Sequence, residues 1–168
     1  MRHIISILLQ NEAGALARVA GMFSARGYNI ESLTVAPTHD ATLSRLTMVT
    51  TGSDAVIEQI IKQSRKLIDV VEIADLTSSA HIETELVLLK VEVDASSGPK
   101  VVECVRRNRA LVLDESATTR TVQFTGTGAE VNGFLAELSG LARVLELVRS
   151  GTAALQSGAT VLAPPVSA

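Results

Sequence analysis

Apolar and polar positions in the first half of the chain change between the period of a strand and the period of a helix. Residues 3–9 are a mainly apolar run that predicts a strand, and a break at residues 10–14 precedes a stretch with apolar residues at helical spacing. Gly27 is placed to end this helix. Its buried stripe is expected to consist of Leu16, Val19, Ala20 and Phe23.

Two β-branched runs follow, over residues 29–36 and 43–51, and turn residues join them, so they predict a strand hairpin. Ser53 and Asp54 offer an N-cap to a second helix. A last strand is expected over residues 70–76. The core side of the second helix is expected to carry Ile57, Ile60, Ile61 and Ile68.

The order strand, helix, strand, strand, helix, strand predicts a ferredoxin-like βαββαβ module. In this plan right-handed crossovers put both helices on one face of an antiparallel sheet, and we expect the other face to be bare. A module of about 75 residues is marginal alone, so pairing with a second copy or a second domain is expected.

A second module with the same order is expected after residue 77, so the predicted fold class is α+β with two ferredoxin-like βαββαβ modules. Ser97 and Pro99 mark the start of its first helix, and Thr127 and Glu130 have capping-box spacing at the start of its second. Its strands are expected at residues 84–93, 111–115, 121–125 and 142–148. The expected limits are 1–77 for the first domain, 82–158 for the second and 159–168 for a flexible tail.

Composition narrows the classes of function. The chain is 46% hydrophobic but only 2% aromatic, so the core must be aliphatic and platforms for stacking bases are nearly absent. Its formal net charge of -3 gives no positive field for nucleic acid or anionic membranes. One cysteine, no apolar run of about 20 residues and no signal-peptide pattern after Met1 predict a cytoplasmic protein.

The loop between the first strand and the first helix is the best candidate for a binding site. Backbone N–H groups at Gly14, Ala15 and Leu16, together with the helix dipole, can hold a carboxylate without any Arg or Lys. Asn11 can add a donor and an acceptor. For an arbitrary loop, the simpler interpretation is that Asn11 caps the helix and Gly14 eases the turn.

This loop and its neighbours closely resemble the ACT-domain start of acetolactate synthase small subunits. The most specific motifs are Asn-Glu-Ala-Gly-Ala-Leu at residues 11–16 and Arg-Gly-Tyr-Asn-Ile-Glu-Ser-Leu at residues 26–33. Residues 95–99 and 117–120 have no counterpart that we can match. The resemblance is carried by residues 5–19, 23–35, 42–47, 59–63, 66–71 and 149–151.

The resemblance implies a homodimer of ACT domains joined edge to edge, with valine bound between one subunit's strand–helix loop and the partner's second strand. It also implies a regulatory role in valine, leucine and isoleucine biosynthesis, in which this chain activates a catalytic large subunit and confers feedback inhibition by valine. Thiamine diphosphate, Mg and FAD would belong to that large subunit. The implied effector contacts are Asn11, Gly14, Ala15 and Leu16 from one chain, and Asn29 and Ile30 from the other.

No catalytic residue, metal site or cofactor of the chain's own is expected. His3, His39 and His81 are far apart, and none has a second ligand at metal-binding spacing. Cys104 lies among apolar residues of an amphipathic stretch, where a buried packing role is simpler than a nucleophile. Gly126-Thr127-Gly128 is better explained as a helix start than as a phosphate loop.

Alternative functions stay open from the residues alone. The first is a free-standing ACT-domain sensor of another amino acid that acts on a different partner protein, and copurification would separate it from a synthase subunit. An RNA-binding pair of ferredoxin-like domains would need strand aromatics that this chain lacks, and a small mutase or lyase would need an acid–base pair. For Asn29, the simpler interpretation is a turn residue. Valine, leucine and isoleucine are not distinguished as effectors.

Overall fold

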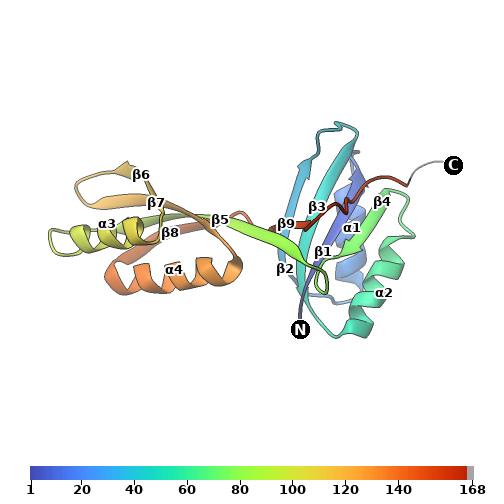
Figure 1. Ribbon diagram of the computed structural model, residues 1–168, viewed down its shortest axis with the longest axis horizontal. Helices are drawn as coiled ribbons and strands as arrows, with labels where there is room; N and C mark the ends of the chain where they lie inside the picture. The colour runs from blue at the N-terminus through green and yellow to red at the C-terminus, as the bar shows by residue number, and fades with distance from the viewer. Residues whose placement is uncertain (166–168) are drawn as a thin grey trace. The chain divides into compact units, whose positions relative to one another are not determined.

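The computed structural model describes residues 1–165, and these divide into two compact units (Figure 1). Unit 1 combines Met1–Ile82 with the chain from Thr152 onward, whereas unit 2 is the continuous segment Glu83–Gly151. Both units contain an antiparallel sheet with two helices, which confirms the α+β class and its two ferredoxin-like modules.

Unit 1 follows the predicted order of elements. Its strands pair antiparallel in the order β2-β3-β1-β4, so the first and third strands lie in the centre of the sheet. This is the order that two crossover helices on one face produce. The elements are β1 (Arg2–Gln10), α1 (Ala15–Ala25), β2 (Ile30–Pro37), β3 (Leu43–Thr51), α2 (Asp54–Ser64) and β4 (Val70–Asp75).

The core of unit 1 is aliphatic and lies between the sheet and its helices. Alternate residues of β1, such as Ile5 and Ile7, are fully buried and face Val19 and Phe23 of α1 and Ile60 of α2. The residues of β1 between them point to the opposite face of the sheet and are not part of this cluster, as the two-residue period of a strand requires. The predicted strand and helix periodicity is therefore confirmed for these elements.

Two of the residues expected in this core are exposed instead. Leu16 is 41% exposed, because the buried stripe of α1 runs through Ala15, Val19, Met22 and Phe23 and leaves Leu16 beside it. Ile68 is 90% exposed, because α2 ends at Ser64 and the helical spacing no longer applies beyond it. Both predictions were wrong.

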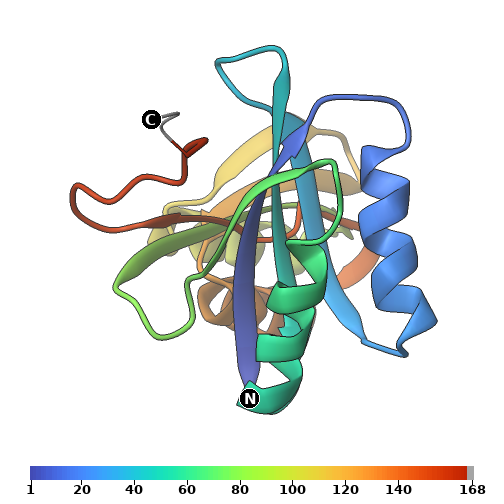
Figure 2. The ribbon, with the colours of Figure 1, turned by 90° about the vertical axis from the view of Figure 1, so that its right-hand side faces the viewer.

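The second face of the unit 1 sheet is partly covered, contrary to our expectation of a bare face. The short strand β9 (Ala153–Gln156) pairs with β5, and Ala154 packs in a buried cluster with Ile4, Val49 and Leu76. Arg45 Nη2 also donates to the carbonyl of Ala154 at 3.4 Å. Figure 2 shows α1 and this C-terminal segment on opposite sides of the sheet.

This returning segment also bears on the expected domain limits. The structure groups residues 152–158 with unit 1, and the expected domain limit at residue 158 stays a prediction. Residues 159–165 of the predicted flexible tail have no helix or strand, and residues 166–168 lie outside the described part of the chain.

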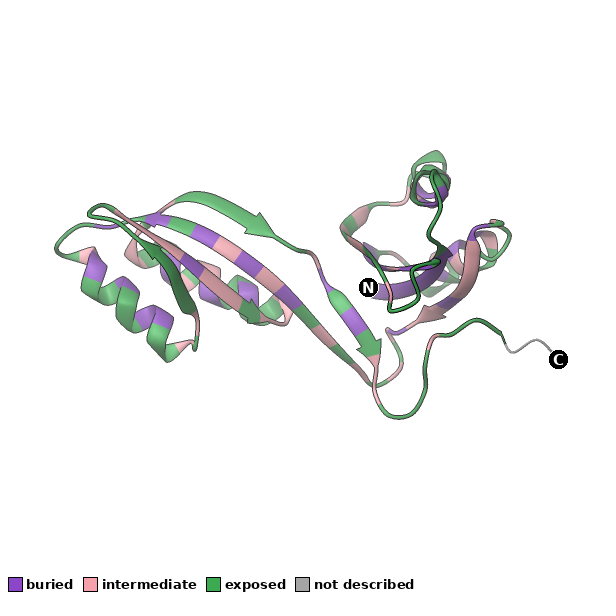
Figure 3. Cartoon of the chain, turned by 90° about the horizontal axis from the view of Figure 1, so that it is seen from above, coloured by how far each residue is buried: buried purple, intermediate pink, exposed green. Residues whose placement is uncertain are grey.

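Unit 2 repeats the plan of unit 1, with strand order β6-β7-β5-β8. Buried residues alternate with exposed or half-buried ones along β5, where Val87, Leu89 and Val91 face the core (Figure 3). The predicted capping box starts α4, since Thr127 Oγ1 accepts from Glu130 N and Thr127 N donates to Glu130 Oε2 at 2.7 Å. The elements are β5 (His81–Glu92), α3 (Ser97–Arg107), β6 (Leu111–Glu115), β7 (Thr119–Gly126), α4 (Gly128–Leu141) and β8 (Arg143–Arg149).

Candidate functional site

The candidate site lies where β1 ends and α1 begins. Gly14 immediately precedes the helix with a φ of +89°, a left-handed conformation that a residue with a Cβ adopts only at a cost. Residues 11–14 are all exposed, and Ala15 is the first buried residue of the helix. The loop therefore presents its backbone to solvent.

Two backbone N–H groups at this helix end have no hydrogen-bond partner among residues 1–165. The first hydrogen bond of α1 joins Arg18 N to the carbonyl of Gly14 at 2.9 Å, and no side chain caps the helix. Ala15 N donates to the carbonyl of Glu12 at 3.2 Å, but among residues 1–165 no backbone carbonyl accepts from the N–H of Gly14 or Leu16. Two of the three predicted donors are thus available to an anion, and the helix dipole adds to them.

Asn11 anchors the loop. Its Nδ2 donates to the carbonyl of Ala41 at 2.9 Å, and its Oδ1 accepts from Ser44 Oγ at 3.0 Å. Its backbone N also donates to the carbonyl of Thr42 at 2.7 Å. In the structure Asn11 therefore joins the loop to β3 and to the turn before it, and its predicted contact with an effector stays a prediction.

Asn29 and Ile30 lie at the other end of the same sheet. Ile30 is opposite Thr50 of β3, whereas Gln10, just before the loop, is opposite Leu43. The two positions are seven residue steps apart along β3, which corresponds to roughly 23 Å along a strand. The structure thus brings Asn11, Gly14, Ala15 and Leu16 together where the loop enters α1, but it does not bring Asn29 or Ile30 to them within one chain.

An ion pair beside Gly14 was not anticipated from the sequence. Arg18 of α1 makes a bidentate contact with Asp69, in which Nε lies 2.5 Å from Oδ2 and Nη2 lies 2.6 Å from Oδ1. Hydrogen bonding to the guanidinium lowers the pKa of Asp69 below its usual value, and the same bonds raise the pKa of Arg18. The partners lie 51 positions apart in the chain, so no local pattern predicts the pair, although the sequence does place Arg18 one helical turn after Gly14.

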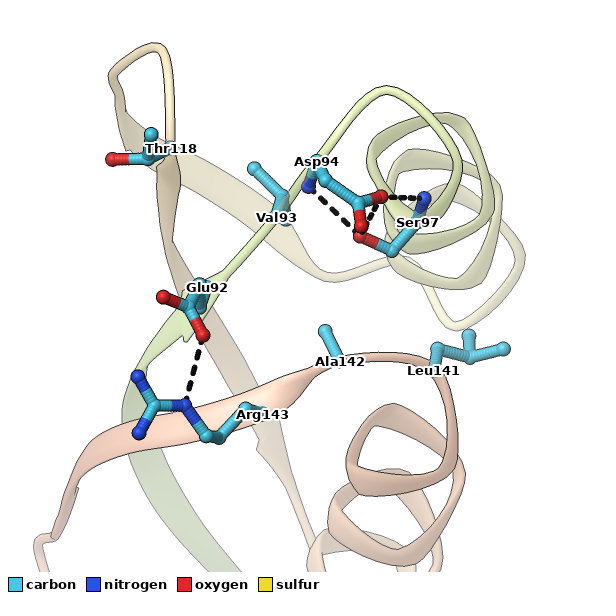
Figure 4. A pocket seen from close by; sticks show the side chains of 8 residues that line it. All are labelled: Glu92, Val93, Asp94, Ser97, Thr118, Leu141, Ala142 and Arg143. Atoms are coloured by element: carbon cyan, nitrogen blue, oxygen red, sulfur yellow. Dashed lines mark hydrogen bonds and ion pairs between the residues drawn. The ribbon is translucent and has the colours of Figure 1, made fainter.

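A hollow of about 430 Å³ in unit 2 is lined by polar and apolar side chains, and its charged side chains already have hydrogen-bond or ion-pair partners (Figure 4). Asp94 accepts from the backbone N of Ser96 and Ser97 at the start of α3, and Glu92 pairs with Arg143 at 2.8 Å. An amino acid's carboxylate would meet the carboxylate of Asp94 there, so this hollow is a poor effector site. Its lining is Glu92, Val93, Asp94, Ser97, Thr118, Leu141, Ala142 and Arg143.

The described residues contain no group of three or more His, Cys, Asp or Glu side chains that could hold a metal ion. His3 is buried in β1, with Nε2 3.3 Å from the carbonyl of Gly52. Cys104 is buried too, and burial raises the pKa of its thiol, which disfavours a nucleophilic thiolate. No helix in residues 1–165 is long and apolar enough to cross a membrane.

Comparison with known proteins gives consistent matches over both units. Residues 5–72 match the family described as AHAS small subunit-like ACT domain, and residues 84–158 match the family described as small subunit of acetolactate synthase. The chain is 46% identical over 162 residues to the acetolactate synthase isozyme 3 small subunit of Salmonella typhimurium, and the aligned region covers 96% of this chain and 99% of that protein. The Escherichia coli protein of the same name is 44% identical over the same shares.

A solved structure supports the same relationship. The crystal structure of the acetolactate synthase small subunit from Thermotoga maritima superposes with a TM-score of 0.87 at 31% identity, over 95% of this chain and 99% of that one.

Proposed function

The chain belongs to the family of acetolactate synthase small subunits. We propose that it is a regulatory subunit that binds the catalytic large subunit, raises its activity and confers inhibition by valine. The observation that carries the proposal is a pair of backbone amides at the start of α1, those of Gly14 and Leu16, which have no partner in the described part of the chain. They suit the α-carboxylate of a free amino acid. The proposed setting is the cytoplasm.

The register of the sheet supports a site shared by two chains. β2 is an edge strand, so its outer side is available to a second copy. Antiparallel pairing of two β2 strands about a twofold axis reverses one of them and places the partner's start of β2 at the end of the sheet where Pro37 lies. Pro37 pairs with Ser44 and Gln10 with Leu43, so this is also the end from which the Gly14 loop emerges.

In this arrangement each site combines two kinds of group. The loop of one chain supplies amide donors at Gly14 and Leu16, and the partner copy supplies the polar amide of Asn29 and the apolar side chain of Ile30. Amide oxygens suit the ammonium group of an amino acid, and the Ile30 side chain suits a branched aliphatic side chain. In the proposed dimer, the Gly14 loop of one chain and Asn29 of the other lie close together, although within one chain they are separated by most of the length of a strand.

Regulation follows by linkage. Valine must bind one arrangement of the dimer more tightly than another, and the favoured arrangement must activate the large subunit less. Thiamine diphosphate, Mg and FAD are proposed to be held by the large subunit, so the chemistry takes place there.

The test is reconstitution with a purified acetolactate synthase large subunit. We expect this chain to increase acetolactate formation, and valine to reverse the increase in parallel with its binding measured by calorimetry. A chain that binds valine but neither copurifies with a synthase nor changes its activity would instead be a sensor for another partner. A monomer that binds none of valine, leucine and isoleucine would contradict the shared site.

A further inference from the structure

The Arg18–Asp69 pair is oriented with its positive end outward. The side chain of Asp69 is 4% exposed, whereas that of Arg18 is 48% exposed. Both carboxylate oxygens of Asp69 are taken by Nε and Nη2 of Arg18, which fixes the plane of the guanidinium. The buried carboxylate therefore acts as a fixed support for an exposed cation.

The remaining guanidinium nitrogen lies at the candidate loop. A Cβ on Gly14 would come within 2.9 Å of Arg18 Nη1, so this end of the guanidinium lies directly against the loop backbone and would have to shift slightly for a larger residue. Among residues 1–165 no group accepts a hydrogen bond from Nη1. The other charge that acts on Arg18 is Glu12, on the same exposed loop.

We infer that Arg18 makes the proposed effector site selective for a free carboxylate, and that Asp69 is the positioning residue that orients its guanidinium. This inference rests on the proposed function and assigns a further residue to the same site. Backbone amides and the helix dipole already bind a carboxylate more tightly than the carbonyl oxygen of a neutral amide, and Arg18 adds a full positive charge to this preference. A cationic Nη1 beside them favours the charged ligand, because hydrogen bonds between ionised groups are the stronger ones.

The simpler alternative is that Arg18 only neutralises the buried Asp69. In that case its loss would disturb the loop and weaken every ligand alike. Ligands that differ only in their carboxyl group separate the two roles, so we choose valine and valinamide as probes.

The experiment is calorimetry of the full chain with both probes. We expect Arg18→Gln to weaken valine about 10- to 100-fold and valinamide less than about threefold, while Arg18→Lys retains part of the valine affinity. Arg143→Gln is the control, because Arg143 also pairs with one carboxylate, Glu92, but lies in unit 2. It should leave both affinities unchanged.

Removing Arg18 alone leaves Asp69 buried without its partner, which can prevent folding. The double variant Arg18→Gln/Asp69→Asn removes both charges and leaves no buried unpaired carboxylate, so it should fold. We expect it to show the same selective loss of valine binding. Asp69→Asn alone should lower valine affinity by a smaller factor, because the guanidinium keeps its charge but loses its orientation.

The outcomes separate this inference from the proposed function. If the unchanged chain binds no valine, both fail. If it binds valine and Arg18→Gln binds equally well, or loses valine and valinamide by equal factors, the role of Arg18 is refuted and the regulatory function stands. If neither the unchanged chain nor any variant binds valinamide, the valine affinity of Arg18→Lys decides. A higher affinity than that of Arg18→Gln supports the inference, and an equal affinity overturns it.

Discussion

Replacing Gly14 by Asp tests the carboxylate site most directly. The new side chain starts from a backbone φ of +89°, and its Cβ would lie 2.9 Å from Arg18 Nη1. Its carboxylate would occupy the space in which the effector's carboxylate is proposed to bind. Repulsion between the introduced carboxylate and the effector, rather than unfolding, is the expected cause of lost regulation.

The stability cost of this change should be small. A residue with a Cβ in a left-handed conformation costs about 1–2 kcal/mol. A carboxylate at a helix N-terminus stabilises the fold by about 0.3–1 kcal/mol, and the first turn of α1 has no acidic residue of its own. A net loss of about 1 kcal/mol leaves a typical domain folded.

The effect on binding should be much larger. Two carboxylates about 4 Å apart repel by about 4 kcal/mol at an effective dielectric constant of about 20. Arg18 and solvent screen part of this, and a residual repulsion of about 2–3 kcal/mol would weaken valine binding about 30- to 150-fold.

Calorimetry and the reconstituted synthase provide the assay. Gly14→Asn is the matched control, because it has the same shape and backbone strain but no charge. We expect Gly14→Asp to lose valine sensitivity while it still activates the large subunit, and Gly14→Asn to lose much less. Equal losses in the two variants would refute the electrostatic reasoning, and unchanged inhibition of Gly14→Asp would remove the site from this loop.

Three further predictions concern other parts of the molecule. Asn29→Ala should weaken valine binding about tenfold by removing a contact to a charged ligand, and unchanged affinity in calorimetry would exclude Asn29. Phe134→Ala leaves a cavity at a fully buried position in unit 2 and should lower the free energy of unfolding, measured by urea titration, by about 3–5 kcal/mol. Ile68→Ala, at a 90% exposed position, should change that free energy by less than about 0.5 kcal/mol. Because the pKa of Asp69 is lowered in the folded state, its carboxylate stabilises the fold at pH values above the unfolded pKa of about 3.9, and this contribution is lost as the pH falls through the folded pKa. Asp69→Asn should therefore flatten the acid side of the curve of unfolding free energy against pH, and an unchanged slope would show that the pair with Arg18 does not contribute.

Much of the fold follows from local patterns in the chain. The alternation along β1 and β5, the helical spacing of Val19 and Phe23, and the Thr127–Glu130 capping box each depend on neighbours within a few residues, so the sequence alone predicts them. The position of Gly14 before a helix is local too, and it indicates both the turn and the exposed amides.

Other features depend on segments that folding brings together from distant parts of the chain. Arg18 meets Asp69 across 51 residues, and Ala154 packs against Ile4 through a strand too short and too rich in small residues to have a period. The pairing of β3 with β1 and β2 places Asn29 and Gly14 at opposite ends of the sheet, although their motifs, residues 26–33 and 11–16, are close in the sequence. Periodicity reports which face of an element is buried, but pairing, register and long-range charge contacts arise only when the elements pack, because their energies depend on distances through space rather than along the chain.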